Sequence, residues 1–353
     1  MRSGKTAVAQ VTGKRVAVLL FNLGGPKAPE DVKPFLYNLF RDKYIIDLPL
    51  GIRQGVASMI ANRRAPAARK NYAYMGGGSP ILRETEAQAQ ALEAYINSRT
   101  PGLEVKVFVG MRYWHPFIET AAADIAKWQP DEVVLLPLYP QFSSTTTLTA
   151  FDAFTKAYRG KGKVTRVCCY AANDHFIKAH TDQIAARLKG LKDLDNYRLL
   201  FSAHGLPEKI VKQGDPYQAQ VEATVARVMA ALPVEIEHVV CYQSRVGPMK
   251  WIGPSTDDTI KQTAKAGKNA IIVPIAFVSE HIETLVELDI EYAHLARAAG
   301  MADYIRIPAL GIDTSFVKAL NDEVLKAVGA GKPIVGDQTC QACHTFCPKR
   351  KAR

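Results

Sequence analysis

No apolar stretch of the 353-residue sequence approaches the roughly 18 residues that a membrane-spanning helix requires. The opening residues, MRSGKTAVAQVTGKR, contain no acidic residue and lack the apolar segment of a secretory signal. They predict a mobile tail over residues 1–14, although a fragment of an organelle transit peptide would have a similar composition. We therefore expect a cytoplasmic protein, with peripheral attachment to the inner membrane as an open alternative.

Signatures of nucleotide and nucleic-acid binding are also missing. The stretch GGGSP (76–80) has neither the Lys–Ser pair of a phosphate-binding loop nor the G-x-G-x-x-G pattern, so a turn that ends in a helix cap is its plainest interpretation. The formal net charge of +11 indicates an anionic partner: nucleic acid, an acidic membrane surface or a carboxylate-bearing ligand. Because the basic residues are scattered and form no long block, nucleic acid is the weakest of the three.

Cysteine is scarce, and three of the six cysteines are crowded into CQACHTFCP (340–348). Without a secretory signal, an extracellular disulfide framework is not expected. Cys340, Cys343 and Cys347 instead favour a metal or an iron–sulfur cluster, while a zinc-binding or unstructured tail remains the alternative.

Short β-rich runs alternate with helical patterns, which predicts an α/β fold of parallel sheets flanked by helices. The clearest strands cover residues 15–23, 105–110, 131–139, 197–203, 237–244 and 269–277. Helical patterns cover residues 87–99, 182–191, 219–232, 279–300 and 313–330. The similarity of VLLFNLGGP (18–26) to LLFSAHGLP (199–207) favours two similar lobes.

The length of the chain fits two domains of about 150 residues each. We expect one lobe over residues 15–165 and a second over 166–312. Residues 313–353 would form a final helix, which could pack back on the first lobe, and a cysteine-bearing extension.

Two motifs follow predicted strands, where α/β folds place their ligands. In LLFSAHGLP, small neighbours leave the imidazole of His204 room to point at a ligand, although turns also use histidine as a structural residue. In SEHIETLVELDIEY (279–292), glutamates recur every three or four residues and share one helix face, which is either a solvated face or part of a site. A carboxylate that reaches His204 would form an acid–base pair.

Segment 41–75 combines apolar residues with several cations and has only Asp42 and Asp47 as acids. Apolar side chains beside cations are typical of surfaces that contact anionic headgroups. An amphipathic core helix with a solvated basic face fits the pattern equally well.

With YQSRVGPMKWIGPST (242–256), FNLGGP (21–26) and GMRYWHPF (110–117), these motifs resemble the ferrochelatase family from about residue 15 to residue 330. The resemblance implies two Rossmann-like lobes, each a parallel sheet flanked by helices, around a porphyrin cleft. It also implies a lyase that inserts ferrous iron into protoporphyrin IX, the last step of haem synthesis. Neutral imidazole would suit the removal of the two pyrrole N–H protons.

The resemblance also implies roles for individual residues. The family's catalytic histidine corresponds to His204 and the glutamate that it faces to Glu283, and both would meet the iron. His281 and Glu287 would form a route for protons or metal. The positions that would line the porphyrin are Leu23, Arg64, Tyr72, Ser79, Arg112, Tyr113 and Trp251.

The tail departs from the family pattern. It resembles the extension that holds a 2Fe-2S cluster in animal and some bacterial members, whose fourth ligand lies where this chain has Ser143 and Ser144. A cluster here would need another ligand, and Cys168 or Cys169 is preferred to Cys241 or His344.

Two other functions remain open at this stage. A coproporphyrin III ferrochelatase would need more cationic partners for its extra propionates. A carrier of tetrapyrroles or metal would explain the cleft without chemistry. A monomer and a homodimer are both compatible with the sequence.

Overall fold

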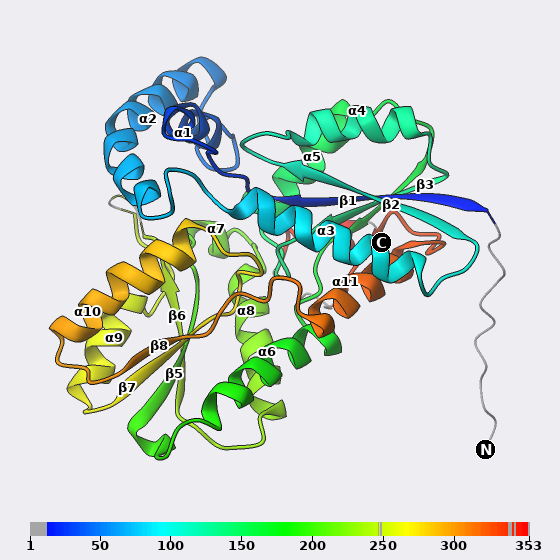
Figure 1. Cartoon of the computed structure of the whole chain (residues 1–353). Coiled ribbons are helices and arrows are strands. Elements are labelled where there is room, and N and C mark those ends of the chain that lie inside the picture. The colour runs from blue at the N-terminus through cyan, green and yellow to red at the C-terminus, as the bar shows by residue number, and fades with distance from the viewer. Residues whose placement is uncertain (1–12, 246, 248, 338–340, 342–343, 352–353) are drawn as a thin grey trace, which may run out of the picture.

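The structure, a computed structural model, describes residues 13–245, 247, 249–337, 341 and 344–351. It has two lobes, each built on a parallel sheet with helices on both faces (Figure 1). Most of the predicted tail, residues 1–12, lies outside the described residues, as do Cys340 and Cys343.

The first sheet has the strand order β2-β1-β3-β4-β9, and every pairing is parallel. Its strands are β1 (Lys14–Asn22), β2 (Leu103–Met111), β3 (Glu132–Pro137), β4 (Lys163–Val167) and β9 (Ile334–Val335). The central strands β1 and β3 are buried almost throughout, as expected for strands covered on both faces. The prediction of parallel sheets is confirmed here.

The second sheet has the order β6-β5-β7-β8, again with parallel pairing. Its strands are β5 (Tyr197–His204), β6 (His238–Gln243), β7 (Asn269–Pro274) and β8 (Tyr304–Arg306). The sequence analysis missed β8 and β9, because strands of three and two residues carry no readable hydrophobic pattern.

The α-helices are α1 (Val32–Phe40), α2 (Leu50–Ala73), α3 (Ile81–Asn97), α4 (Ile118–Trp128), α5 (Thr149–Ala157), α6 (Asp174–Leu188), α7 (Glu208–Lys212), α8 (Tyr217–Ala231), α9 (Thr256–Lys265), α10 (Tyr292–Ala298), α11 (Thr314–Ala327) and α12 (Pro348–Lys351). Two π-helical segments, η2 (Ser144–Leu148) and η4 (Glu283–Glu291), precede α5 and α10. Short 3₁₀ turns are η1 (Pro29–Asp31) and η3 (Leu194–Asn196). No helix in the described part of the chain has the length and apolar character needed to cross a bilayer.

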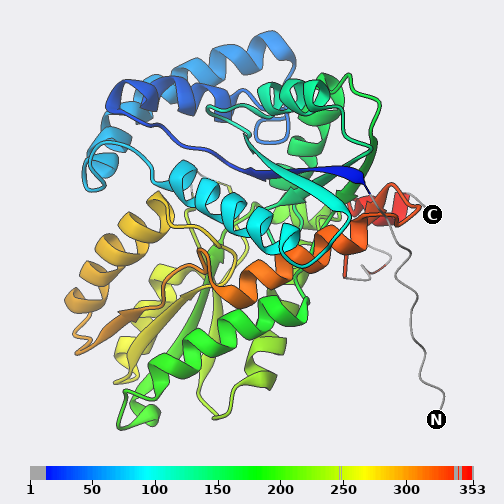
Figure 2. The same ribbon diagram turned by 45° about the vertical axis from the view of Figure 1, so that its right-hand side comes forward.

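Helices α1 and α2 pack together and project beyond the first sheet, at the upper left of Figure 1. We call the segment from Arg41 to Ala73, which includes α2, the lip. Helix α11 runs back to the first lobe, where it packs on α3, β3 and β4, and it also contacts α6. Figure 2 shows α11 between α3 and α6.

Candidate functional site

The carboxyl ends of the two central strands meet at the junction of the lobes. Asn22 ends β1, and its side-chain amide donates to Ser279 Oγ at 3.4 Å, just beyond β7. Gln88 on α3 donates to the backbone carbonyls of Val278 and Gly311 at 2.7 and 3.0 Å. The polar loops at these strand ends therefore face one another, as in other α/β sites.

His204 and Glu283 form the central pair of this junction. His204 is the last residue of β5, and its Nδ1 lies 2.8 Å from Glu283 Oε2. The His204 side chain keeps 39 % of its surface exposed, whereas that of Glu283 keeps 20 %. Because Nδ1 faces the carboxylate, Nε2 on the other side of the ring is left for a ligand.

Each member of the pair favours the charged form of the other. Burial disfavours the imidazolium, but the charge and hydrogen bond of Glu283, together with the charge of Glu287, outweigh burial and raise the pKa of His204. Burial alone would raise the pKa of Glu283, yet His204 and His281 lower it to about 2. The imidazole therefore holds its proton to higher pH than an isolated histidine.

Glu287 lies one turn further along η4 and is surrounded by donors. Its carboxylate accepts from Gln243 Nε2 at 3.0 Å, from the backbone N–H of Ser244 at 2.8 Å, from the Ser244 hydroxyl, and from Tyr292 OH at 3.0 Å. Ser244 has a φ of 63°, an unusual conformation for a residue other than glycine. Burial and the neighbouring Glu283 charge raise the pKa of Glu287.

His281 completes this group. Its Nε2 lies 3.9 Å from Glu283 Oε2, and its Nδ1 lies 3.1 Å from the carbonyl oxygen of Ser279. Burial lowers the pKa of His281. The structure thus brings together His204, Glu283, His281 and Glu287, which the sequence placed in two separate motifs.

Two tyrosines of the first lobe approach the same carboxylate. Burial and then the charge of Glu283 raise the pKa of both Tyr72 and Tyr139. The hydroxyl of Tyr139 is buried and has no hydrogen-bond partner among the described residues. Sequence reasoning missed Tyr139, although its place just after a buried strand could have indicated it.

Arg112 and Tyr113 are fixed by a carboxylate that the sequence analysis did not assign. Asp42 accepts from Arg112 Nη2 at 2.7 Å, from Tyr113 OH at 3.0 Å and from Thr149 Oγ1 at 2.5 Å. The charge of Arg112 also acts to lower the pKa of Tyr139, so Arg112 lies near that tyrosine.

The other predicted residues are distributed around this centre. The ring of Trp251 lies so close to Gly205 that a Cβ at that glycine would meet Trp251 Cε3 at 3.3 Å. Ser79 packs against Gly25, where a Cβ would lie 2.6 Å from the Ser79 Cβ. The loops 24–26 and 76–79 can therefore approach each other this closely only because residue 25 is glycine.

Leu23 packs in the cluster under the lip. Arg64 is exposed and lies over the ring of Phe40.

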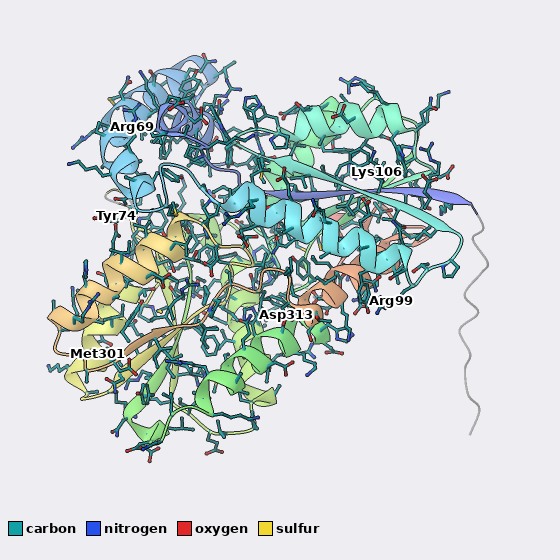
Figure 3. The ribbon with its side chains drawn as sticks, in the orientation of Figure 1. Arg69, Tyr74, Arg99, Lys106, Met301 and Asp313 are labelled. Atoms are coloured by element: carbon teal, nitrogen blue, oxygen red, sulfur yellow. The ribbon has the colours of Figure 1, made fainter. Side chains whose placement is uncertain are left out.

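The end of α2 reaches the second lobe near these residues. Asn71 Nδ2 donates to Glu291 Oε1 at 3.2 Å, which joins the lip to the last residue of η4. Figure 3 labels Arg69 on this part of the lip and Tyr74, the residue that directly follows the lip.

Three cysteines gather away from the junction. Cys168 and Cys169 Sγ atoms are 3.5 Å apart, and the Cys168 thiol also interacts with Cys347 of the tail. Hydrogen bonding to Cys169 and Cys347, together with burial, raises the pKa of Cys168. Among the described residues no group of three or more His, Cys, Asp or Glu side chains is arranged to hold a metal ion. Cys241 is buried elsewhere, with its thiol at the Phe201 carbonyl.

The comparisons with known proteins agree with the architecture. A sequence profile described as Ferrochelatase matches residues 15–328. The chain is 52 % identical over 346 residues to a ferrochelatase of Hyphomonas neptunium, covering 97 % of this chain and 96 % of that protein. It is 53 % identical over 342 residues to a ferrochelatase of Caulobacter vibrioides strain NA1000, covering 96 % and 98 %. The solved structure of SirB from Bacillus subtilis with Fe³⁺ shares the fold, with a TM-score of 0.54, 13 % identity and coverage of 90 % and 96 %.

Proposed function

This chain belongs to the ferrochelatase family, whose members insert iron into a porphyrin for haem synthesis, and we propose that its substrates are Fe²⁺ and protoporphyrin IX. We assign the chemistry to His204 and Glu283. The observation that supports this assignment is their 2.8 Å contact at the junction, with Nε2 of the imidazole left open.

The reaction replaces two pyrrole N–H bonds with bonds to iron. The metal enters as Fe²⁺ and stays Fe²⁺, and two protons leave the macrocycle. When its imidazole is neutral, His204 takes a pyrrole proton on Nε2. Glu283 then stabilises the imidazolium that results. Both residues would also meet the incoming iron.

Glu287 and His281 would carry protons or metal between this pair and the outside of η4. The raised pKa of Glu287 supports a role in accepting protons, because its carboxylate is easier to protonate than a free one. Tyr72, Ser79, Arg112, Tyr113, Leu23 and Trp251 would line the macrocycle, and Arg64 at the exposed edge would pair with a propionate.

Protoporphyrin IX is favoured over coproporphyrin III by the balance of charge at the junction. Arg112 is already paired with Asp42, and the carboxylates of η4 lie on the other side. Arg112 would therefore offer no unpaired charge to the extra propionates of coproporphyrin III. Purified protein should insert Fe²⁺ into protoporphyrin IX at a higher kcat/KM than into coproporphyrin III, and the opposite ranking would contradict this choice.

Replacing His204 with alanine separates an enzyme from a carrier. We expect His204→Ala to bind protoporphyrin IX with nearly unchanged affinity, measured by fluorescence quenching, and to lose iron insertion. A variant that still metallates within a few-fold of the parent would remove His204 from the chemistry.

We also propose that the lip docks on a membrane, which would deliver an apolar porphyrin. The support is the set of exposed apolar side chains at Leu48, Leu50, Ile52 and Met59. Ile46, by contrast, is partly buried, so Leu50 is the better test position. Vesicle co-sedimentation should weaken in Leu50→Asp.

A 2Fe-2S cluster is the further element that we propose for the tail. Thiolates are the usual ligands of such clusters, and the buried Cys347 already meets Cys168, whose Sγ lies 3.5 Å from that of Cys169. Cys340, Cys343 and Cys347 would supply three ligands and Cys168 the fourth. When bound, the cluster would tie the tail to the body of the first lobe.

The cluster proposal is tested on protein reconstituted without oxygen. We expect visible absorption and about two irons per chain in the parent, with both reduced in Cys168→Ser. Colourless parent protein would overturn the cluster, and full iron content in Cys168→Ser would overturn the fourth ligand.

A further inference from the structure

A cavity of about 400 Å³ lies beside the lip, on the outer side of the first lobe. Its charged wall contains more basic than acidic side chains. The basic residues are Arg41, Lys43, Arg53, Arg112 and Lys156, and the acidic residues are Asp42, Glu119 and Asp152. We call this cavity the lip pocket.

Two of the acidic side chains are neutralised from within the protein. Asp42 is paired with Arg112 and accepts two further hydrogen bonds. Asp152 accepts from Tyr44 OH at 2.6 Å and lies 3.6 Å from Lys43 Nζ. The wall of the pocket therefore keeps an excess of positive charge.

Three cations of the pocket remain without an acidic partner. Within the part of the chain that the structure describes, no carboxylate forms an ion pair with Arg41, Arg53 or Lys156. Arg53 donates through Nη1 to the Leu48 carbonyl at 3.1 Å, but its buried Nε makes no hydrogen bond with any residue that the structure describes. A buried donor without a partner is costly, so a ligand with acceptor oxygens would be stabilised there.

The surface next to the pocket is apolar. Leu50 and Ile52, which precede Arg53 in the first turn of α2, are 63 % and 60 % exposed, and Leu48 is 38 % exposed. Apolar side chains beside a cationic recess match a phospholipid, whose acyl chains and phosphate lie side by side at a membrane surface.

We propose that the lip pocket binds the phosphate of an anionic phospholipid, with Arg53, Arg41 and Lys156 as donors. This inference rests on the membrane docking proposed above and adds a site of defined chemistry to it. Arg112 lines this pocket and also acts on the pKa of Tyr139, so one side chain connects the proposed lipid site with the junction.

The test compares binding of the full chain to vesicles of phosphatidylcholine alone and of phosphatidylcholine mixed with phosphatidylglycerol. The pocket variant is Arg53→Gln with Lys156→Gln, and the docking variant is Leu50→Asp. Arg99→Gln serves as the matched control, because Arg99 is an exposed arginine that pairs with no carboxylate in the described part of the chain and lies far from the lip (Figure 3). Thermal unfolding of each variant checks that the fold is intact.

We expect the parent to prefer the phosphatidylglycerol vesicles. The pocket variant should lose at least about fivefold in this preference for each cation removed. Leu50→Asp should weaken binding to both vesicles and keep the preference, and Arg99→Gln should behave as the parent. A pocket variant that keeps the full preference would overturn the pocket alone, whereas a parent that binds neither vesicle would overturn the docking as well.

Free phosphate is the competing occupant. Replacing chloride with inorganic phosphate at constant ionic strength should leave the binding of the parent to vesicles nearly unchanged. Loss of the phosphatidylglycerol preference in phosphate buffer would show that the pocket takes the free anion, and would overturn the assignment to lipid.

Discussion

The acidic segment of the second lobe and the lip of the first lobe differ in whether their charged side chains have partners within the protein. Along residues 280–291, Glu283 is paired with His204, Glu287 accepts from several donors, and Arg306 pairs with both Glu280 and Asp289. In the lip, Arg41 and Arg53 pair with no carboxylate among the described residues, and apolar side chains are exposed. Charges that are buried inside the protein need internal partners, whereas the exposed cations of the lip are solvated and remain free to meet an external anion.

The largest effect is expected from breaking the pair at the junction. Glu283→Gln keeps the size of the side chain but removes its charge, so it can neither stabilise an imidazolium nor take a proton. Insertion of Fe²⁺ into protoporphyrin IX should fall at least about a hundredfold, measured under saturating substrates. Porphyrin binding and the thermal midpoint serve as controls, and activity within a few-fold of the parent would exclude Glu283 from the chemistry.

The second-largest effect is expected when the ion pairs that Arg306 forms with the acidic segment are removed. Arg306 donates to both Asp289 oxygens, at 2.7 and 2.6 Å, and to Glu280 Oε1 at 2.6 Å, so it ties the two ends of the segment that carries Glu283. Arg306→Met should lower kcat about tenfold or more, since small displacements of catalytic groups are costly. It should also destabilise the protein by about 3 kcal/mol.

Arg198 offers a matched control for this variant. Its side chain is 14 % exposed, against 11 % for Arg306, and it pairs with Glu237 near the start of β5, the strand that ends at His204. Arg198→Met should cost less stability than Arg306→Met, because Glu237 is 42 % exposed and keeps its ion pair with Lys268, and it should leave kcat nearly unchanged. Equal losses of kcat in the two variants would reduce the role of Arg306 to general stability.

A smaller effect concerns pH. The base must be neutral to accept a proton, so insertion should decline as the pH falls through the raised pKa of His204, above the usual value of about 6.5. Glu287→Gln removes one negative charge that raises this pKa, and the acid limb of the pH–rate profile should move to lower pH. A limb that stays in place, or moves upward, would contradict the coupling of Glu287 to His204.

The smallest effect is expected in the lip. Because the guanidinium of Arg41 has no ion pair among the described residues, Arg41→Gln should change the free energy of unfolding in solution by less than about 0.5 kcal/mol. Chemical denaturation without lipid measures this. A loss comparable to that in Arg306→Met would show that Arg41 has an internal partner, and the contrast between the two regions would fail.

The position of the site at the ends of two strands could be predicted from the sequence, because continuous apolar runs show where buried strands end. The runs that end at His204 and at residue 277 are continuous and apolar, and ligands gather at such ends in α/β folds. The pairing of His204 with Glu283 followed from that rule and from the family resemblance. The geometry of the pair, and its effect on both pKa values, required the structure.

Other features depended on contacts that no local pattern encodes. Asp42 meets Arg112 across 70 positions of sequence, and Arg306 lies on a strand of three residues. The glutamates every three or four residues predicted an ordinary helix, but Glu283–Glu291 is π-helical, since side-chain pairing to β6 and β8 outweighs local preference.

The return of the chain through α11 has a mechanical consequence. The polypeptide passes from the first lobe to the second after β4 and comes back before α11, whose continuation adds β9 to the first sheet beside β4. Two covalent links therefore span the lobes, and both reach the same side of the first sheet. A body held by two parallel tethers can rock about the line that joins them but resists twisting. The hydrogen bond between Asn71 and Glu291, which joins the lip to η4, would have to break if such rocking drew these two segments apart.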